Sequence, residues 1–169
     1  QAVNDSPVNT VPTFQVTVSE DGALVFSSVV TQSGPQNTPS AEPGDDHADS
    51  PGSDGTSLVL DSMGVGQGSG TLEEAGDRDV FALVLDASGS VQVDLGKAPN
   101  SNVDTFLRVY DSQGTQVAFN DDGGVGLNSL LTFFAQAGTY YLQAAAFADS
   151  GTGAYLVSVV FAPVHLSIA

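Results

Sequence analysis

Four acidic side chains crowd one short stretch of the sequence, and this crowding is the first indication of chemistry. The stretch LEEAGDRDVFALVL, residues 72–85, contains Glu73, Glu74, Asp77 and Asp79 but only one cation, Arg78. Neighbouring carboxylates cost free energy unless water, hydrogen bonds or a metal ion offsets their repulsion. Asp77 and Asp79 are two residues apart, so on a strand they would project from the same face. These two acids are therefore the first candidates for a cation site.

A second group of acids lies upstream, in EPGDDHADS, residues 42–50: Asp45, Asp46 and Asp49. Together with Asp77 and Asp79 they would supply several carboxylate oxygens, and Ca2+ takes six to eight oxygen ligands in irregular geometry. The alternative is a solvated strand end in which Arg78 makes a surface ion pair worth less than ~1 kcal/mol. The residues alone leave both interpretations open.

Other polar motifs indicate turns more than sites. NDDGG, Asn120 to Gly124, lacks the alternating acids and the distant Glu of an EF-hand loop, so it is predicted to be a turn. GGVGLNSLL resembles one nonapeptide calcium repeat, but such repeats work as stacked arrays and this is a single copy.

No catalytic constellation is recognisable in the sequence. ADSGTG around Ser150 superficially resembles a serine-protease nucleophile loop, but His47 lies in a polar linker and His165 in the tail, away from any triad context. Paired carboxylates for glycoside hydrolysis cannot be placed across a cleft from sequence. Because cysteine is absent, thiol nucleophiles, disulfides and zinc-thiolate sites are excluded. The chain is predicted not to be an enzyme.

Charge and composition restrict the partners. The formal net charge is −17, with 20 acids against three Lys and Arg in 169 residues. Nucleic acid is disfavoured because phosphate binding needs Lys and Arg, and an anionic membrane surface is disfavoured for the same reason. No run approaches the ~18 apolar residues that a membrane helix needs, so membrane insertion is not expected. No signal peptide is visible after Gln1, and the chain is expected to be a piece of a longer protein.

The elements that must position the acids are strands. Nineteen Gly, eight Pro and many Val and Thr favour strands joined by turns, and no amphipathic helix is evident. Residues 1–30 contain a predicted strand pair around an EDG turn, and residues 31–55 form a linker rich in Pro, Gly and Asp. Residues 56–163 contain about eight to nine strands, predicted to be an antiparallel β-sandwich or jelly roll, and residues 164–169 are a tail. The segments predicted as strands are SLVLDS, GTLEE, DVFALVL, SVQVDL, TFLRVYD, TQVAFN, SLLTFF, GTYYLQAAAF and GAYLVSVVF.

Alternation assigns most aromatic side chains to the core. In the last predicted strand a single face carries Tyr155, Val157, Val159 and Phe161, and this face is expected to be buried. Tyr110, Tyr140, Tyr141 and Phe147 are likewise expected to be mostly in the core, although an exposed subset could form a ligand platform.

Residues 42–162 resemble the bacterial pre-peptidase C-terminal domain family. The resemblance is carried by ordered motifs: GTLEEAGDRDVFAL, DTFLRVYDSQG, VAFNDDGG, LNSLLTF, AGTYYLQAAAF and GTGAYLVSV. It implies a small β-sandwich that serves as an accessory module in secreted bacterial proteins, often beside peptidases. The collagen-binding domains of clostridial collagenases are similar, and they bind calcium through an acidic segment before the first strand and an acidic strand entrance. The matching positions here are Asp45, Asp46, Asp49, Asp77 and Asp79.

The beginning of the chain resembles a different family. NDSPVNTVPTFQVTVSEDGALVFSS looks like the opening of cadherin-like repeats in giant bacterial surface and adhesion proteins. This resemblance implies a junction between modules of a long exported protein. An unpaired hairpin in residues 1–30 also invites strand addition or exchange between copies of the chain.

The combined expectation is a non-catalytic, secreted or cell-surface module that calcium stabilises at a junction with neighbouring modules. The alternatives are a recognition module for a polysaccharide or a fibrous extracellular protein, and a structural spacer without a ligand. Exposed aromatic side chains on one sheet face would favour recognition.

Overall fold

The computed structural model describes residues 15–18, 24–27 and 44–164 and divides the chain into two compact units, residues 1–38 and 39–169. In the first unit, β1 (Gln15–Val18) pairs antiparallel with β2 (Leu24–Ser27), with Gln15 opposite Ser27. The predicted strand pair is therefore present, while its predicted turn and the tail beyond residue 164 lie outside the described residues.

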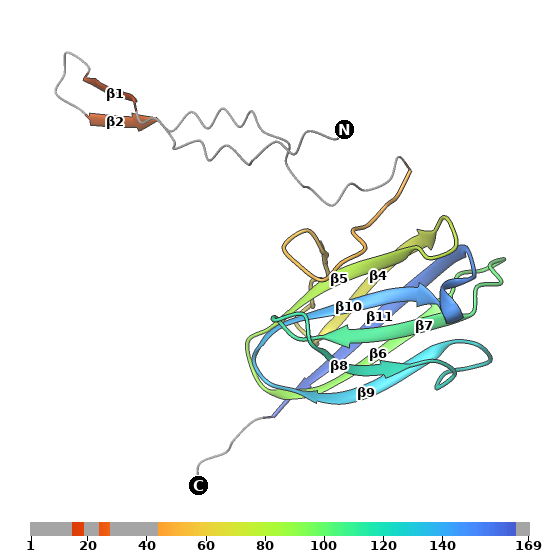
Figure 1. Cartoon of the computed structure of the whole chain (residues 1–169). Coiled ribbons are helices and arrows are strands. Elements are labelled where there is room, and N and C mark those ends of the chain that lie inside the picture. The colour runs from red at the N-terminus through yellow and green to blue at the C-terminus, as the bar shows by residue number, and fades with distance from the viewer. Residues whose placement is uncertain (1–14, 19–23, 28–43, 165–169) are drawn as a thin grey trace, which may run out of the picture. The chain divides into compact units, whose positions relative to one another are not determined.

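The second unit contains two sheets, with nine strands in its described residues (Figure 1). The first sheet has the order β3-β5-β10-β7-β8. Its strands are β3 (Thr56–Ser57), β5 (Arg78–Leu85), β10 (Gly138–Ala146), β7 (Thr105–Tyr110) and β8 (Gln116–Asn120). The second sheet has the order β4-β11-β6-β9. Its strands are β4 (Val65–Leu72), β11 (Gly153–Pro163), β6 (Gly89–Lys97) and β9 (Ser129–Ala135). All pairings are antiparallel except that of β3 with β5. The predicted all-β sandwich is confirmed.

Alternating side chains make these segments strands and give each sheet one buried face. In β6 every second residue is buried, namely Val91, Val93 and Leu95, and its neighbours are exposed. In β11 the predicted core face is confirmed, because Tyr155, Val157, Val159 and Phe161 are all buried. A short 3-10 helix, η1 (Phe147–Asp149), follows β10. Among the described residues no helix is long and apolar enough to cross a membrane.

Two features of the first strands differ from the prediction. β3 consists of Thr56 and Ser57, so it contains only the first residue of the expected SLVLDS strand. The glycine-rich run VGQGSG, which precedes the expected GTLEE strand, is already part of β4. Its glycines leave room for side chains from the opposite sheet, because a Cβ at Gly68 would lie 2.9 Å from a ring carbon of Phe81.

Candidate metal centre

Asp79 lies in the core of the sandwich. It is 0% exposed, and its Oδ2 accepts a hydrogen bond from the Tyr155 hydroxyl at 2.6 Å. Its Oδ1 is buried and has no hydrogen-bond partner in the part of the chain that the structure describes. The pKa of Asp79 is raised to about 8, chiefly by burial. The hydrogen bond from Tyr155 lowers this pKa, and the charges of Asp77 and Asp46 raise it further. The buried carboxyl is therefore mostly protonated at neutral pH.

Asp77 lies just before the strand, because β5 begins at Arg78. Its two carboxylate oxygens accept backbone N–H groups, one from Glu73 at 2.7 Å and one from Arg78 at 2.6 Å. These bonds hold the turn that precedes β5 and fix the Asp77 carboxylate at the strand entrance. Sequence spacing predicts that Asp77 and Asp79 share one face of a strand. In the structure Asp77 shapes a turn and Asp79 lies in the core.

His47 bridges the two sheets beside this entrance. Its Nε2–H donates to the Ser69 carbonyl of β4 at 3.0 Å, so its Nδ1 accepts the Thr56 hydroxyl of β3 at 2.6 Å in the neutral ring. The imidazole also packs against Phe81, with ring centroids 4.7 Å apart. A Cβ at Gly70 would lie 2.8 Å from His47 Cδ2 and would meet the Tyr155 hydroxyl, so this glycine makes room for both.

Hydrogen bonds hold the acidic segment around His47 against both sheets. The Val80 N–H donates to the Ala48 carbonyl at 2.9 Å, and the Gln143 side chain donates to the Asp49 carbonyl at 2.9 Å. The Thr71 N–H donates to Asp46 Oδ2 at 3.1 Å. Although predicted as linker, residues 44–49 therefore occupy defined positions next to the β5 entrance.

Two carboxylate trios form where this segment meets the entrance, and Asp45 belongs to both. The first trio is Asp45, Asp49 and Asp77, and the second is Asp45, Asp46 and Glu73. Within each trio the carboxylate oxygens lie within 4.8 Å of one another. Four of the five predicted ligands thus come together. Asp79 lies in neither trio, and Glu73, which sequence reasoning did not propose as a ligand, joins the second one.

Glu73, in the second trio, has a raised pKa. The pKa of Glu73 is raised to about 7 by burial, by its hydrogen bond with Asp77 and by the charge of Asp46. A divalent cation would offset this repulsion. The donors are hard carboxylate oxygens of the kind that calcium prefers, so these residues fit a calcium ion.

A third acidic trio lies at the same end of the first sheet, beside the start of β7 and the end of β8. The carboxylate oxygens of Asp104, Asp121 and Asp122 are within 4.8 Å of one another. The last two belong to the predicted NDDGG turn, which is held by the Asn120 side chain, whose Oδ1 accepts the N–H groups of Gly123 at 2.8 Å and Leu130 at 3.0 Å.

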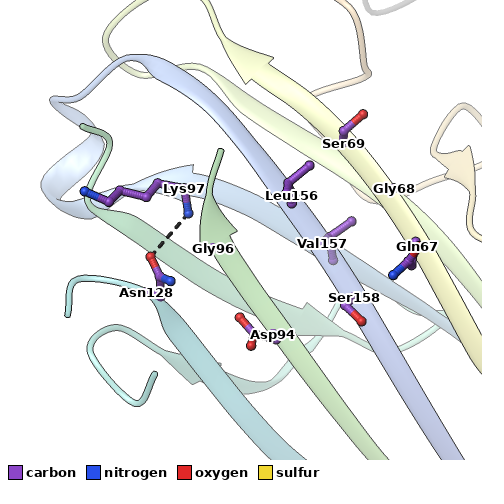
Figure 2. A pocket seen from close by; sticks show the side chains of 10 residues that line it. All are labelled: Gln67, Gly68, Ser69, Asp94, Gly96, Lys97, Asn128, Leu156, Val157 and Ser158. Carbon is purple, nitrogen blue, oxygen red and sulfur yellow. Dashed lines mark hydrogen bonds between the residues drawn. The ribbon is translucent and has the colours of Figure 1, made fainter. Parts of the chain in front are cut away.

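A groove of about 620 Å³ lies on the second sheet (Figure 2). It crosses β4, β11 and β6 and is bordered by Asn128, whose Oδ1 accepts the Lys97 N–H at 3.2 Å. Its lining is mainly small and polar, with Asp94 and Lys97 as the charged residues and Leu156 as an exposed apolar one. In the described part of the chain, no aromatic side chain lines this groove.

The aromatic expectations are corrected in part. Tyr155 is fully buried as predicted, but Phe147 is 48% exposed, and Tyr110, Tyr140 and Tyr141 are only partly buried. Tyr110 and Tyr141 lie opposite each other on the outer face of the first sheet, where alternation places side chains away from the core.

Comparison with known proteins supports the predicted family. Residues 77–146 match the family model of the bacterial pre-peptidase C-terminal domain. This match confirms the resemblance over those residues; the cadherin-like resemblance of the first residues stays a prediction. None of the curated proteins compared with this chain matches it.

Two solved structures are similar to the chain. The pre-peptidase C-terminal domain of collagenase from Bacillus anthracis is 18% identical, with a TM-score of 0.50, over 62% of this chain and 93% of that chain. The periplasmic inhibitor of g-type lysozyme from Aeromonas hydrophila is 16% identical, with a TM-score of 0.45, over 63% of this chain and 96% of that chain. At these identities the likeness to the collagenase domain shows the fold.

Proposed function

We propose that this chain is a non-catalytic accessory module of a secreted or cell-surface bacterial protein, stabilised by calcium where the chain enters its sandwich. The observation that carries the proposal is the pair of carboxylate trios sharing Asp45, which join segment 44–49 to the residues just before β5. The family match of residues 77–146 supports the accessory role and the extracellular setting.

In this proposal Asp45, Asp46, Asp49, Glu73 and Asp77 hold calcium. The ion neutralises their mutual repulsion and ties the entering segment to the strand entrance, in addition to the hydrogen bonds already made by Ala48, Asp49 and His47. Asp79 is not a ligand in this arrangement; its buried charge is instead suppressed by the surrounding core. The junction with the preceding module is stiffened as a consequence.

Thermal unfolding with and without calcium tests the proposal. An ion that binds only the folded state at 100 times its dissociation constant adds about 2.7 kcal/mol, or about 5–10 °C in midpoint for a domain of this size. We expect that increment in the chelator-stripped wild type and its loss in Asp45→Asn, since Asp45 belongs to both trios. The exposed Asp86→Asn variant is the charge-matched control and should keep the full increment.

Equal increments in Asp45→Asn and the control would place calcium elsewhere and overturn this assignment. No increment in the wild type would leave the trios as a solvated acidic strand end, with the module role resting on the family match alone.

A second candidate function, recognition of another macromolecule, is favoured by a separate observation. The outer face of the first sheet exposes Phe119 at 60% and Phe147 at 48%. Exposed apolar clusters of this kind mark interaction surfaces.

A further inference from the structure

Three phenylalanines from different elements form one cluster, which we term the aromatic patch: the partly buried Phe106 of β7 and the exposed Phe119 of β8 and Phe147 of η1. The rings of Phe106 and Phe119 stack, with centroids 5.9 Å apart and planes at 12°. The rings of Phe106 and Phe147 lie 6.5 Å apart at 37°. Neighbouring Val117 is also 50% exposed. Water therefore contacts a continuous apolar surface that core packing does not require.

The third acidic trio, Asp104, Asp121 and Asp122, borders this patch. The beginning of β7 and the ends of β8 and β10 meet at the same end of the first sheet (Figure 1). Asp104 precedes Phe106 by two residues, and Asp121 follows Phe119 by two. The N–H of Phe147 donates to the Asp104 carbonyl at 2.9 Å. The rings and the carboxylates therefore form one surface.

The chain itself supplies no cation to this trio. In the described part of the chain, Arg78 and Arg108 both pair with Asp149, at 2.7 Å and 3.6 Å, and no Lys or Arg pairs with Asp104, Asp121 or Asp122. Among the residues that the structure describes, one oxygen of Asp104 and one of Asp121 are buried and have no hydrogen-bond partner. The surface therefore combines exposed rings with negative charge that lacks a counterpart.

We propose that the aromatic patch and the Asp104–Asp121–Asp122 trio together dock a segment of another protein that carries lysine or arginine. The apolar stem of such a side chain would cover the phenylalanine rings while its charged end reaches the carboxylates. Arg108 already makes this kind of contact within the chain, because its guanidinium lies 4.4 Å from the Phe106 ring centroid.

Charge complementarity selects the class of partner. A second copy of this chain is a poor partner, because it has only three Lys and Arg, two of which are paired with Asp149, and a net charge of −17. Anionic polymers are repelled by the same charge. A neutral polysaccharide could contact the rings but would leave the charge of the Asp104, Asp121 and Asp122 carboxylates unpaired. A basic polypeptide matches both the rings and the acids.

This inference deepens the second candidate function and does not involve the calcium trios, so its failure leaves the calcium proposal standing. The test is a titration of the full chain, followed by NMR chemical shifts, with a short synthetic peptide of alternating lysine and alanine. Its glutamine counterpart, a soluble neutral glucan and calcium chloride alone are the comparison probes. A moderate, constant ionic strength limits nonspecific attraction to the acidic surface.

Two double variants remove one half of the surface each, and each has a matched control. Phe119→Ser/Phe147→Ser removes rings, and Phe134→Ser removes an equally exposed phenylalanine from β9 of the other sheet. Asp121→Asn/Asp122→Asn removes charge, and Asp86→Asn/Asp94→Asn removes the same charge from exposed positions elsewhere. Unchanged thermal midpoints confirm that each variant is folded.

We expect the lysine peptide to shift resonances of the patch and the glutamine peptide not to do so. Both double variants should weaken its affinity by about fivefold or more, because the ring variant loses cation–π contacts and the acid variant loses charge-assisted hydrogen bonds. The controls should weaken it by less than about twofold. Equal weakening in variants and controls would show nonspecific attraction and overturn the proposal. It would also be overturned if the glucan alone bound, or if calcium alone saturated the trio and displaced the peptide.

Discussion

Replacing Asp79 by Asn should lower the stability of the protein at acidic pH and raise it at neutral pH. The Asp79 carboxyl is fully buried, bonded to the Tyr155 hydroxyl through one oxygen and without a partner for the other. Its pKa is raised from 3.8 to about 8, chiefly by burial. The folded state therefore keeps a proton on Asp79 that the unfolded chain releases at acidic pH. Asn has nearly the same shape and carries no charge.

The magnitude follows from proton linkage. Below about pH 4 both states are protonated, so the contribution of this carboxyl to stability is fully present. As pH rises toward about 8, the unfolded state ionises and the folded state does not, which costs about 1.4 kcal/mol per pH unit. At pH 7 the accumulated loss is about 4 kcal/mol. The Asn variant avoids this loss but leaves a buried amide group without a partner, which costs about 1–3 kcal/mol.

We therefore expect Asp79→Asn to be less stable than the wild type near pH 4 and more stable by about 1–3 kcal/mol at pH 7. Urea unfolding between pH 4 and 8, with a chelator present throughout, measures both curves. Asp86→Asn, at an exposed position, should follow the wild-type curve. Parallel curves for the wild type and Asp79→Asn would refute the reasoning, because Asp79 would then ionise normally in the folded protein.

Three further predictions concern the same end of the sandwich. Gly70→Ala should destabilise the chain by about 1–3 kcal/mol in urea unfolding, because its Cβ would meet the Tyr155 hydroxyl. Gly52→Ala is the control and should be nearly neutral, because the space around its Cβ is open. Equal effects of the two substitutions would count against the close fit at Gly70. His47→Ala should cost about 2–3 kcal/mol, since it removes hydrogen bonds to both sheets and the ring contact with Phe81; a loss below ~0.5 kcal/mol would show that His47 does not join the sheets. Calcium binding at pH 7 should release about half a proton from Glu73, whose pKa is about 7. Calorimetry in two buffers of different ionisation enthalpy measures this release. Calcium binding without proton release would place Glu73 outside the site.

The strands that could be predicted were those with large alternating side chains. Val91, Val93 and Leu95 in β6, and Tyr155 and Phe161 in β11, show a two-residue period that only a half-buried strand satisfies. The glycine-rich part of β4 could not be predicted this way. Its inward positions are glycines because side chains from the other sheet fill the space, and glycine by itself indicates a turn.

The candidate metal centre was predictable in composition but not in arrangement. Acids grouped along the sequence identified Asp45, Asp46, Asp49 and Asp77, which the fold brings together. The role of Asp79 depends on Tyr155, which lies 76 positions away in the sequence and meets it only in the folded core. Glu73 enters the site because a turn held by Asp77 directs it there, and turn geometry of this kind is not visible in residue spacing.

The aromatic patch shows a different limit of sequence reasoning. Alternation identifies which side chains share a face of a strand but not which face is the core. Phe106 and Phe119 become neighbours only through the register of β7 with β8, in which Arg108 lies opposite Phe119. Phe147 joins them from a short helix whose position depends on the Asp104 carbonyl.

The central claim is that calcium binds where segment 44–49 meets the entrance of β5. Its most direct test is a calcium titration by isothermal calorimetry of the full, chelator-stripped chain beside its Asp45→Asn/Asp77→Asn variant. We expect saturable binding to the wild type with a dissociation constant of about 10⁻³ M or tighter, typical of extracellular modules, and its loss in the variant. Wild-type protein that takes up no calcium at millimolar concentrations, or a variant that binds it equally well, would contradict the account.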